Sequence, residues 1–240
     1  MYISDLIIKD KTIVALDELF FEAPVKKAIQ QLIKEYSYAE ELIKYELPVN
    51  NKILLHGASG CGKTATAKAI AATLGKELLV LNLSNVICAK MGETAQNIKM
   101  VFDKAAREKS ILFLDEFDQI AKMRSLDDKD VGEMRRLVTS VIQLIDYYPQ
   151  DSILICATNH IDFIDPAIIR RFQLRINYKL PQKEVLDTYY DRLLMRYPED
   201  MQHINRIYQI SFAEARDHTL TAVKELLIKQ LERAQSLTTI

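Results

Sequence analysis

Cysteine, tryptophan, net charge and long apolar runs are all scarce or missing in this sequence of 240 residues. There is no tryptophan, and the three cysteines, Cys61, Cys88 and Cys156, lie within motifs or apolar runs. So few thiols, odd in number, indicate reduced cysteines in a cytosolic protein and exclude a disulfide framework. No apolar run approaches membrane-spanning length, and the first residues lack a basic, apolar leader. We therefore expect a cytoplasmic protein without a membrane partner.

The charge balance excludes a general attraction to polyanions. Thirty-two basic residues stand against thirty-three acidic ones, which gives a net charge of -1. Without a field of one sign, nucleic acid is not an expected partner, although a local basic patch stays possible. Hydrophobic residues make up 49% and charged residues 27%, as in ordinary globular proteins. The sequence contains neither an internal repeat nor a low-complexity segment.

Apolar runs of strand length alternate with patterns of helical period, which predicts an α/β fold with a parallel five-stranded sheet flanked by helices. The expected strands cover residues 53–55, 78–81, 111–114, 153–156 and 174–178. After Pro181 only helical patterns remain, so we expect a small all-helical domain. The predicted organisation is an N-terminal extension over 1–22, an α/β domain over 23–180 and a helical domain over 181–240. Residues 6–21 have no clear period.

A glycine-rich turn follows the first core strand and opens a helix. The sequence G-x-x-x-x-G-K-T between a strand and a helix is typical of a phosphate-binding loop. Its glycines leave backbone N–H groups free to point at phosphates, and the helix N-terminus adds partial positive charge. Lys63 is expected to reach the β- and γ-phosphates, and Thr64 to bind Mg²⁺. The predicted nucleotide contacts are Gly57, Ala58, Ser59, Gly60, Cys61, Gly62, Lys63, Thr64 and Ala65.

Two adjacent carboxylates, Asp115 and Glu116, end the apolar strand 111–114. Like charges this close raise each other's pKa, so the pair favours a nearby cation. Asp115 suits the shell of a magnesium ion, and Glu116 suits activation of the attacking water. The simpler alternative is a strand end that meets solvent.

Two further motifs carry polar side chains that suit phosphoryl transfer. Asn159 follows the strand 153–156 and is expected at the same sheet edge as the phosphate loop, where its amide could hold water or the γ-phosphate. Alternatively it only forms a turn. Arg170 and Arg171 close a short helix begun at Pro166, where cations are favoured in any case. Their guanidinium groups could instead stabilise charge on a transferring phosphoryl group.

In this order and spacing, the phosphate loop, Asp115-Glu116, Ala157-Thr158-Asn159 and Arg170-Arg171 resemble the AAA+ ATPases, within them the classical AAA clade. The run from Gly92-Glu93-Thr94 onward looks similar to small bacterial AAA proteins without a separate substrate-recruiting domain. The resemblance implies ATP and Mg²⁺ as cofactors, a helical lid and a homo-oligomeric ring, usually a hexamer. It also implies that Asn159 is the sensor-1 residue and that Arg170 and Arg171 act on the neighbour's ATP.

The sequence departs from the clade where a ring grips polypeptide. A basic-aromatic pair is usual before Gly92, but here Ala89 and Lys90 stand there, followed by Met91. Threading of a substrate is therefore not an expectation. In the lid, the sequence 211–214 resembles the small-residue sensor-2 region, with Ala213 as the expected nucleotide contact. Arg216 is an alternative contact or a solvated helix residue, and oxidation of Cys61 is a hypothetical block to ATP binding.

Three function classes remain open from the sequence. The first is an AAA ATPase that remodels or regulates a separately encoded protein partner. The second is a DNA-associated AAA+ loader, against which the near-neutral charge argues. The third is a nucleotide-gated regulatory module with low turnover, which the missing pore aromatic keeps open.

Overall fold

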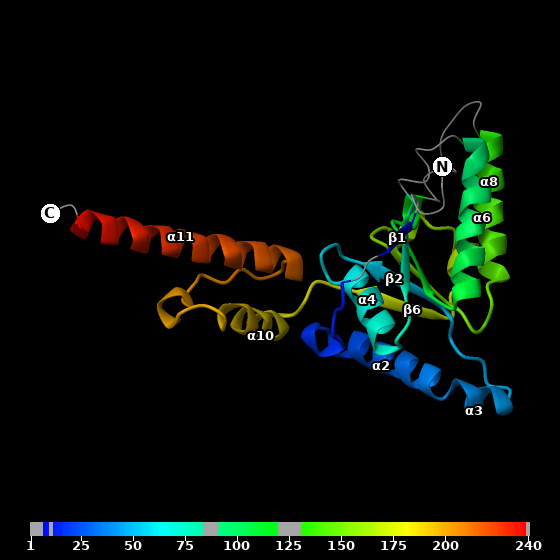
Figure 1. Ribbon diagram of the computed structural model, residues 1–240, viewed down its shortest axis with the longest axis horizontal. Helices are drawn as coiled ribbons and strands as arrows, with labels where there is room; N and C mark the ends of the chain where they lie inside the picture. The colour runs from blue at the N-terminus through cyan, green and yellow to red at the C-terminus, as the bar shows by residue number, and fades with distance from the viewer. Residues whose placement is uncertain (1–6, 10–11, 84–90, 120–130, 239–240) are drawn as a thin grey trace. The chain divides into compact units, whose positions relative to one another are not determined.

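The structure, a computed structural model, describes residues 7–9, 12–83, 91–119 and 131–238 (Figure 1). Its contacts divide the chain into two compact units. Unit 1 comprises Met1–Leu19, Pro24–Gly57 and Lys63–Tyr178, and unit 2 comprises Phe20–Ala23, Ala58–Gly62 and Lys179–Ile240. The glycine turn is thus divided between them: its first glycine and its lysine belong to unit 1, and the residues between belong to unit 2.

Unit 1 is built on a six-stranded sheet with the order β1-β3-β4-β5-β2-β6. The five strands from β3 to β6 in this order run parallel, whereas β1 pairs antiparallel with β3 at the edge. All five parallel strands therefore end at the same edge of the sheet. The strands are β1 (Ile7–Lys9), β2 (Lys52–Gly57), β3 (Leu78–Asn82), β4 (Ile111–Asp115), β5 (Ile153–Thr158) and β6 (Leu174–Tyr178).

The predicted α/β fold with five parallel strands is confirmed, and each expected run lies within one strand. The sixth strand, β1, is an addition that the sequence analysis did not contain. It has only three residues, Ile7–Lys9, which are too few to establish a period of two. These three residues form a strand because they pair with β3, and their local sequence pattern does not predict this pairing.

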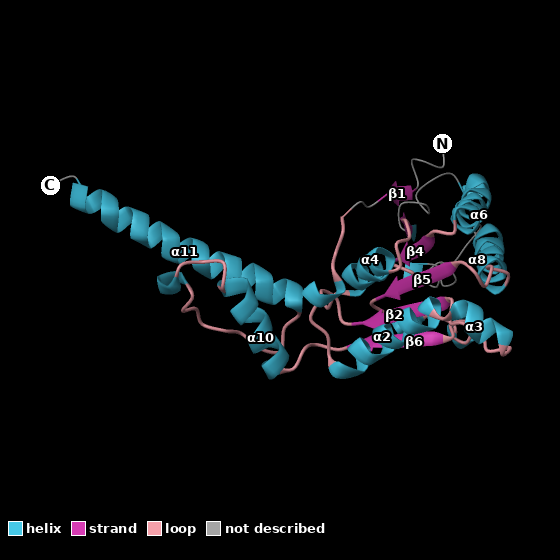
Figure 2. Ribbon diagram, turned by 60° about the horizontal axis from the view of Figure 1, so that its bottom comes forward, coloured by secondary structure: helices cyan, strands magenta, loops and turns pink. Residues whose placement is uncertain are grey.

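The parallel strands are buried on both faces because helices cover them. Leu54, Leu112 and Leu154 alternate with residues of the opposite face and share one core with α6 and α8. Helix α4 contacts β3, β4 and β5, and Figures 1 and 2 draw it on the other side of the sheet from α6 and α8. The helices of this part are α2 (Ala23–Ser37), α3 (Ala39–Lys44), α4 (Lys63–Thr73), α6 (Met91–Glu108), α8 (Val131–Asp146) and α9 (Pro166–Ile169), with 3-10 turns η1 (Leu16–Glu18) and η3 (Ile161–Phe163).

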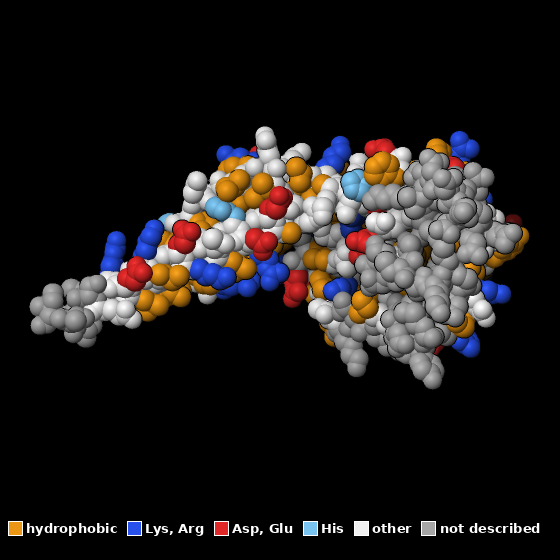
Figure 3. Space-filling view, turned by 90° about the horizontal axis from the view of Figure 1, so that it is seen from above, with side chains coloured by type: hydrophobic (Ala, Val, Ile, Leu, Met, Phe, Trp, Pro, Cys, Tyr) orange, Lys and Arg blue, Asp and Glu red, His pale blue; other side chains and the backbone are white. Residues whose placement is uncertain are grey.

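After Pro181, the described residues of unit 2 form helices and the loops between them without a strand, which confirms the predicted C-terminal helical region. It contains α10 (Lys183–Leu194), the 3-10 turn η4 (Glu199–Met201) and α11 (Phe212–Thr238). Leu186, Tyr190 and Ala215 form its buried centre. Farther along α11, Leu227, Ile228 and Leu231 are exposed, and hydrophobic side chains are visible along this helix in Figure 3.

Two surface properties bear on the expected partners. Among the residues that the structure describes, none of the helices combines the length and apolarity that a bilayer crossing requires. On the face drawn in Figure 3, basic and acidic side chains are interspersed.

Candidate active site

The site begins where β2 ends at Gly57, beside the end of β6. Gly57 pairs with Tyr178 in the sheet and has a φ of 118°, in the region that favours glycine. A Cβ atom at this position would lie 2.1 Å from the backbone oxygen of Tyr178. Only glycine lets the chain leave β2 along this path, because both the backbone angle and the contact exclude a side chain.

Lys63 and Thr64 follow as the first residues of α4, with Lys63 facing back toward the end of β2. The Lys63 side chain is buried, at 8% exposure, and its Nζ donates to the Gly57 carbonyl at 2.8 Å. The N-terminus of α4 adds partial positive charge beside this ammonium group. Positive charge is thus concentrated at the turn, as an anion-binding site requires.

The middle of the turn is held by the start of α11 within unit 2. Gly60 has a φ of 70°, and its carbonyl accepts a hydrogen bond from the Ala213 N–H at 3.2 Å. A Cβ on Gly60 would come within 2.5 Å of the Ser211 hydroxyl. The Ser211 N–H and hydroxyl both donate to Glu214, which fixes this helix start and lowers the pKa of Glu214. Ala213, the predicted lid contact, therefore lies against Gly60 within unit 2.

Other loop positions differ in exposure. Cys61 is buried at 3% exposure, whereas Ser59 is exposed. Arg216, the alternative lid contact, is exposed on α11. Ala58 and Ala65 flank the glycines and are partly buried.

Asp115 ends β4 with its carboxylate beside α4. Its Oδ2 accepts from the Thr64 hydroxyl at 3.2 Å, and its Oδ1 accepts from the Glu116 N–H at 2.9 Å. Burial raises the pKa of Asp115 in spite of these hydrogen bonds. A bound cation would favour the ionised form, and neighbouring hydroxyl and carboxylate oxygens are ligands of the kind that Mg²⁺ takes. The donor set therefore fits a magnesium site.

Glu116 stands next to Asp115 in an unusual backbone conformation. Its φ is 54°, in the left-handed region that non-glycine residues seldom occupy. Such conformations persist only where surrounding contacts impose them, and they concentrate at functional sites. The following residue, Phe117, donates its N–H to the Ala157 carbonyl of β5 at 2.8 Å. Asn159 comes directly after β5 and is exposed at the same edge of the sheet.

Arg170 and Arg171 lie toward the edge of the sheet at which the parallel strands begin, opposite the edge at which these strands end. The Gln173 N–H donates to the carbonyl of Lys52, the first residue of β2. A strand rises about 3.3 Å per residue, so roughly 16 Å separates Lys52 from Gly57 at the other end of β2. The structure brings Lys63, Thr64, Asp115 and Glu116 together, but it does not bring the two arginines to them within one chain.

The two arginines also differ from each other. The Arg171 Nε lies 2.7 Å from an Asp146 carboxylate oxygen at the end of α8, and its Nη1 donates to the Ala167 carbonyl. Arg170 is exposed at the end of α9. Arg171 is therefore engaged within its own chain, while Arg170 presents its guanidinium group to the surface.

Some predicted positions cannot be placed. Ala89 and Lys90, which stand where the clade has its pore pair, lie outside the described residues. Met91 and Gly92 begin α6, but their surroundings also lie outside the described part of the chain.

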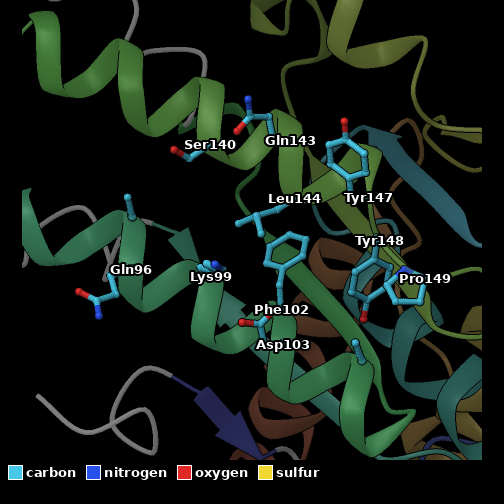
Figure 4. A pocket seen from close by; sticks show the side chains of 12 residues that line it. Gln96, Lys99, Phe102, Asp103, Ser140, Gln143, Leu144, Tyr147, Tyr148 and Pro149 are labelled. Carbon is cyan, nitrogen blue, oxygen red and sulfur yellow. The ribbon is translucent and has the colours of Figure 1, made fainter.

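A separate groove of about 700 Å³ lies between α6 and α8 (Figure 4). Phe102 and Tyr148 pack edge to face in its wall, with ring centroids 5.5 Å apart, and Tyr147 at the end of the groove is 85% exposed. Lys63, Thr64, Asp115 and Glu116 do not line it. The candidate site is thus identified by its charges and backbone, and not by this cavity.

Comparison with known families agrees with these motifs. Residues 53–180 match the model of the ATPase family associated with various cellular activities (AAA). The chain belongs to the AAA family. One AAA relative is the uncharacterized AAA family ATPase y4kL of Sinorhizobium fredii, which is 31% identical over 222 residues. The match covers 91% of this chain and 67% of y4kL.

Solved AAA structures share the fold. The AAA domain of FIGL-1 aligns with a TM-score of 0.69 at 20% identity and covers 89% of this chain and 72% of the FIGL-1 chain. The same domain in complex with ADP aligns at 21% identity. A katanin structure concerned with self-assembly aligns with a TM-score of 0.72 at 21% identity, over 94% of this chain and 76% of the katanin chain. At these identities the likeness supports the AAA fold alone.

The sequence analysis missed one residue that shapes the site, Tyr178. Besides meeting Gly57, it donates its hydroxyl to the Thr66 hydroxyl of α4 at 2.8 Å. Burial raises the pKa of the Tyr178 phenol, so the hydroxyl stays a donor at ordinary pH. Tyr178 was predicted only as a strand residue, because its partners are distant in the sequence.

Proposed function

We propose that this AAA family member binds ATP at the turn from Gly57 to Ala65 and hydrolyses it at sites shared between copies of the chain. The observation that carries the proposal is the separation of charge between the two sheet edges. Lys63, Asp115 and Glu116 lie together at the edge where the parallel strands end, and Arg170 lies near the other. Among the residues that the structure describes, one copy therefore has the groups proposed for binding and water activation at one edge, while Arg170 lies toward the other.

Each residue at the first edge has a chemical role in the proposed reaction. Lys63 leaves the Gly57 carbonyl and donates to the β- and γ-phosphates, which are stronger acceptors. Glu116 takes the proton of the attacking water, and Asn159 orients that water or the γ-phosphate. Bound Mg²⁺ would be held by Thr64 and Asp115 and would offset charge on the phosphates. Ala213 is the contact that we propose for the nucleotide in unit 2.

The role of the arginines follows from their place in the sheet. A guanidinium group stabilises the charge that develops on a transferred phosphoryl group. Arg170 lies toward the other edge of the sheet in its own chain, so we assign it to the ATP of an adjoining copy. Arg171, paired with Asp146, holds the end of α9 in place. A head-to-tail contact of this kind forms a ring where the rotation between copies closes, and we propose a hexamer, the form that the family resemblance implies.

Mixing two inactive variants tests this proposal directly. Glu116→Gln removes the base but keeps Arg170, and Arg170→Ala keeps the base. Each alone should hydrolyse little ATP, whereas a mixture should regain activity at about a quarter of its interfaces if copies associate at random. As a control, Glu116→Gln mixed with the double variant Glu116→Gln/Arg170→Ala cannot form a complete site.

Two results would contradict the proposal. Wild-type protein that hydrolyses no ATP at any concentration would exclude the ATPase. Hydrolysis that survives Arg170→Ala, or that has the same rate per chain at all concentrations, would exclude the shared site.

The partner of this ATPase is proposed to be a separately encoded protein in the cytoplasm, which the enzyme remodels or regulates. The absence of an aromatic residue at Ala89 or Lys90 favours, as a second candidate, a nucleotide-gated regulatory module with low turnover. ATPase activity measured with and without proteins captured by the Glu116→Gln variant in ATP distinguishes the two. Stimulation by the partner supports remodelling, and low turnover in both conditions supports the module. Salt-sensitive DNA binding would instead favour a DNA-associated loader.

A further inference from the structure

Asp118 and Thr158 are buried polar residues next to the catalytic segment, and the mechanism above does not use them. Their exposures are 4% and 1%. The Thr158 hydroxyl donates to the Asp118 carboxylate at 2.9 Å and accepts from the His160 N–H at 2.9 Å. A buried hydroxyl that serves as both donor and acceptor fixes the relative position of the groups that it joins.

The first group that this hydroxyl fixes is the turn carrying Glu116. Asp118 lies two residues beyond Glu116, whose φ of 54° must be imposed by its surroundings. The Phe117 N–H bonds to the Ala157 carbonyl, and the Asp118 side chain bonds to Thr158. The turn is thus attached to β5 at two successive residues, by one backbone bond and one side-chain bond.

The second group is the chain that leaves β5. Because the His160 N–H returns to the Thr158 hydroxyl, the backbone bends around Asn159. Asn159 is exposed at the edge of the sheet, between Thr158 and His160, which the hydrogen bond to the Thr158 hydroxyl joins. The hydroxyl therefore contacts both segments from which Glu116 and Asn159 project.

We propose that Thr158 and Asp118 form a positioning pair that holds Glu116 and Asn159 in register for hydrolysis. This inference rests on the proposed ATPase function and adds two residues that touch neither nucleotide nor water. Both act through their neighbours. Loss of the bond should release the turn to a relaxed conformation, in which Glu116 no longer meets the attacking water at the required angle. ATP binding, which depends on Lys63 and the glycine turn, should change little.

The experiment compares Thr158→Val with Thr158→Ser in the full-length protein. Valine keeps the shape of threonine and removes the hydroxyl, whereas serine keeps the hydroxyl. We expect Thr158→Val to lower kcat about 10- to 100-fold, as small displacements of catalytic groups do. Its Kd for ATP should stay within about 3-fold of wild type, and Thr158→Ser should restore most of kcat.

Two controls separate positioning from a general loss of stability. Ser110→Ala removes another buried hydroxyl, at the far end of β4, and should leave kcat unchanged. The double variant Thr158→Val/Asp118→Ala, compared with both single variants, tests whether the residues act together. If Thr158 works through Asp118, its kcat should be no lower than that of the slower single variant.

The outcomes distinguish this inference from the proposed function. If wild-type protein hydrolyses ATP and Thr158→Val keeps at least half of that rate, the proposed positioning role of Thr158 is contradicted. The proposed ATPase function is then retained. A loss of ATP affinity equal to the loss of kcat, without rescue by Thr158→Ser, would also overturn the positioning role. If Thr158→Val does not fold, Thr158→Ser and Asp118→Ala decide: wild-type kcat is expected for the first and a reduced kcat for the second, and equal values contradict the pair. Wild-type protein without activity removes the proposed function itself.

Discussion

At the edge where the parallel strands of unit 1 end, charged side chains are packed together, whereas near the opposite edge the arginines are either paired or exposed. Asp115 accepts two hydrogen bonds and still has a raised pKa, because burial disfavours its charge. Near the other edge, Arg171 is matched by Asp146, and Arg170 is exposed. Under the proposed function, a ligand would complete the first edge, and the second edge would supply a cation to another copy of the chain.

The largest expected effect is loss of the exposed arginine. Arg170→Ala should lower ATP hydrolysis by about 10³-fold or more, because an arginine supplied to a transferred phosphoryl group contributes 10³ to 10⁵ in rate. The melting temperature should stay near that of wild type, since the side chain is exposed. Steady-state ATPase assays and thermal unfolding measure the two quantities. If Arg170→Ala hydrolysed ATP at the wild-type rate, Arg170 would not contribute to hydrolysis at the site of Lys63 and Glu116.

Loss of the proposed base comes next. Glu116→Gln should lower kcat by about 10²- to 10⁴-fold, the usual range for a general base. ATP should remain bound, because glutamine keeps the shape of the residue and Lys63 is intact. Nucleotide retention on the isolated protein measures this, with Glu22→Gln as a control at a carboxylate outside the site. Hydrolysis at the wild-type rate would assign Glu116 a different role.

The fold of the first edge depends on Gly57 more than on any exposed charge. Gly57→Ala should lower the free energy of unfolding by about 3 kcal/mol, because a methyl group meets the Tyr178 backbone and the φ is unfavourable. Gly75→Ala is the matched control: its φ is 62°, but a Cβ there meets nothing within 4 Å. Urea unfolding should therefore rank Gly57→Ala well below Gly75→Ala. Equal values would show that the close approach to β6 is unimportant.

At the second edge, Arg171 is expected to affect stability. Its ion pair with Asp146 is about one-third exposed on each side, so solvent weakens it. Arg171→Ala should lower the free energy of unfolding by about 1 kcal/mol or less. Asp146→Asn should have a similar effect, and the two should not add in a double variant. Additive losses would mean that the pair is not coupled.

The smallest expected effect is a pH dependence at the end of β2. Burial, together with the nearby charges of Lys63 and Arg175, lowers the pKa of His56 below 6.5. Below that pH the unfolded chain binds a proton that the folded chain resists, so stability falls as pH falls from 6.5 toward the lowered pKa. Melting temperatures from about pH 7 to about 5.5 should fall less for His56→Gln than for wild type. His203→Gln, at an exposed position, controls for the loss of a histidine; an identical slope for His56→Gln and wild type would contradict the prediction.

The sequence predicted the features that depend on local pattern. Apolar runs identified all five parallel strands, and Asp115, which ends one of them, lies within hydrogen-bond distance of Thr64 in the structure. The sequence analysis missed the pairing of β1, the contact of Tyr178 with Gly57 and the engagement of Arg171. It also left Thr158 and Asp118 without a role. Their hydrogen bond spans 40 residues, and that of Tyr178 with Thr66 spans 112. Periodicity specifies which face a residue takes, but it does not specify which distant side chain it meets.

The short strand β1 has a consequence for how the protein behaves at high concentration. By pairing with Leu79–Leu81, β1 satisfies backbone N–H and C=O groups that would otherwise make β3 an exposed edge strand. A long exposed edge strand can pair with strands of other molecules, and such pairing leads to aggregation. We therefore expect β1 to protect β3 from pairing with other molecules. A truncation that removes these three residues should increase the insoluble fraction of the protein, although the residues of the proposed nucleotide site are unchanged.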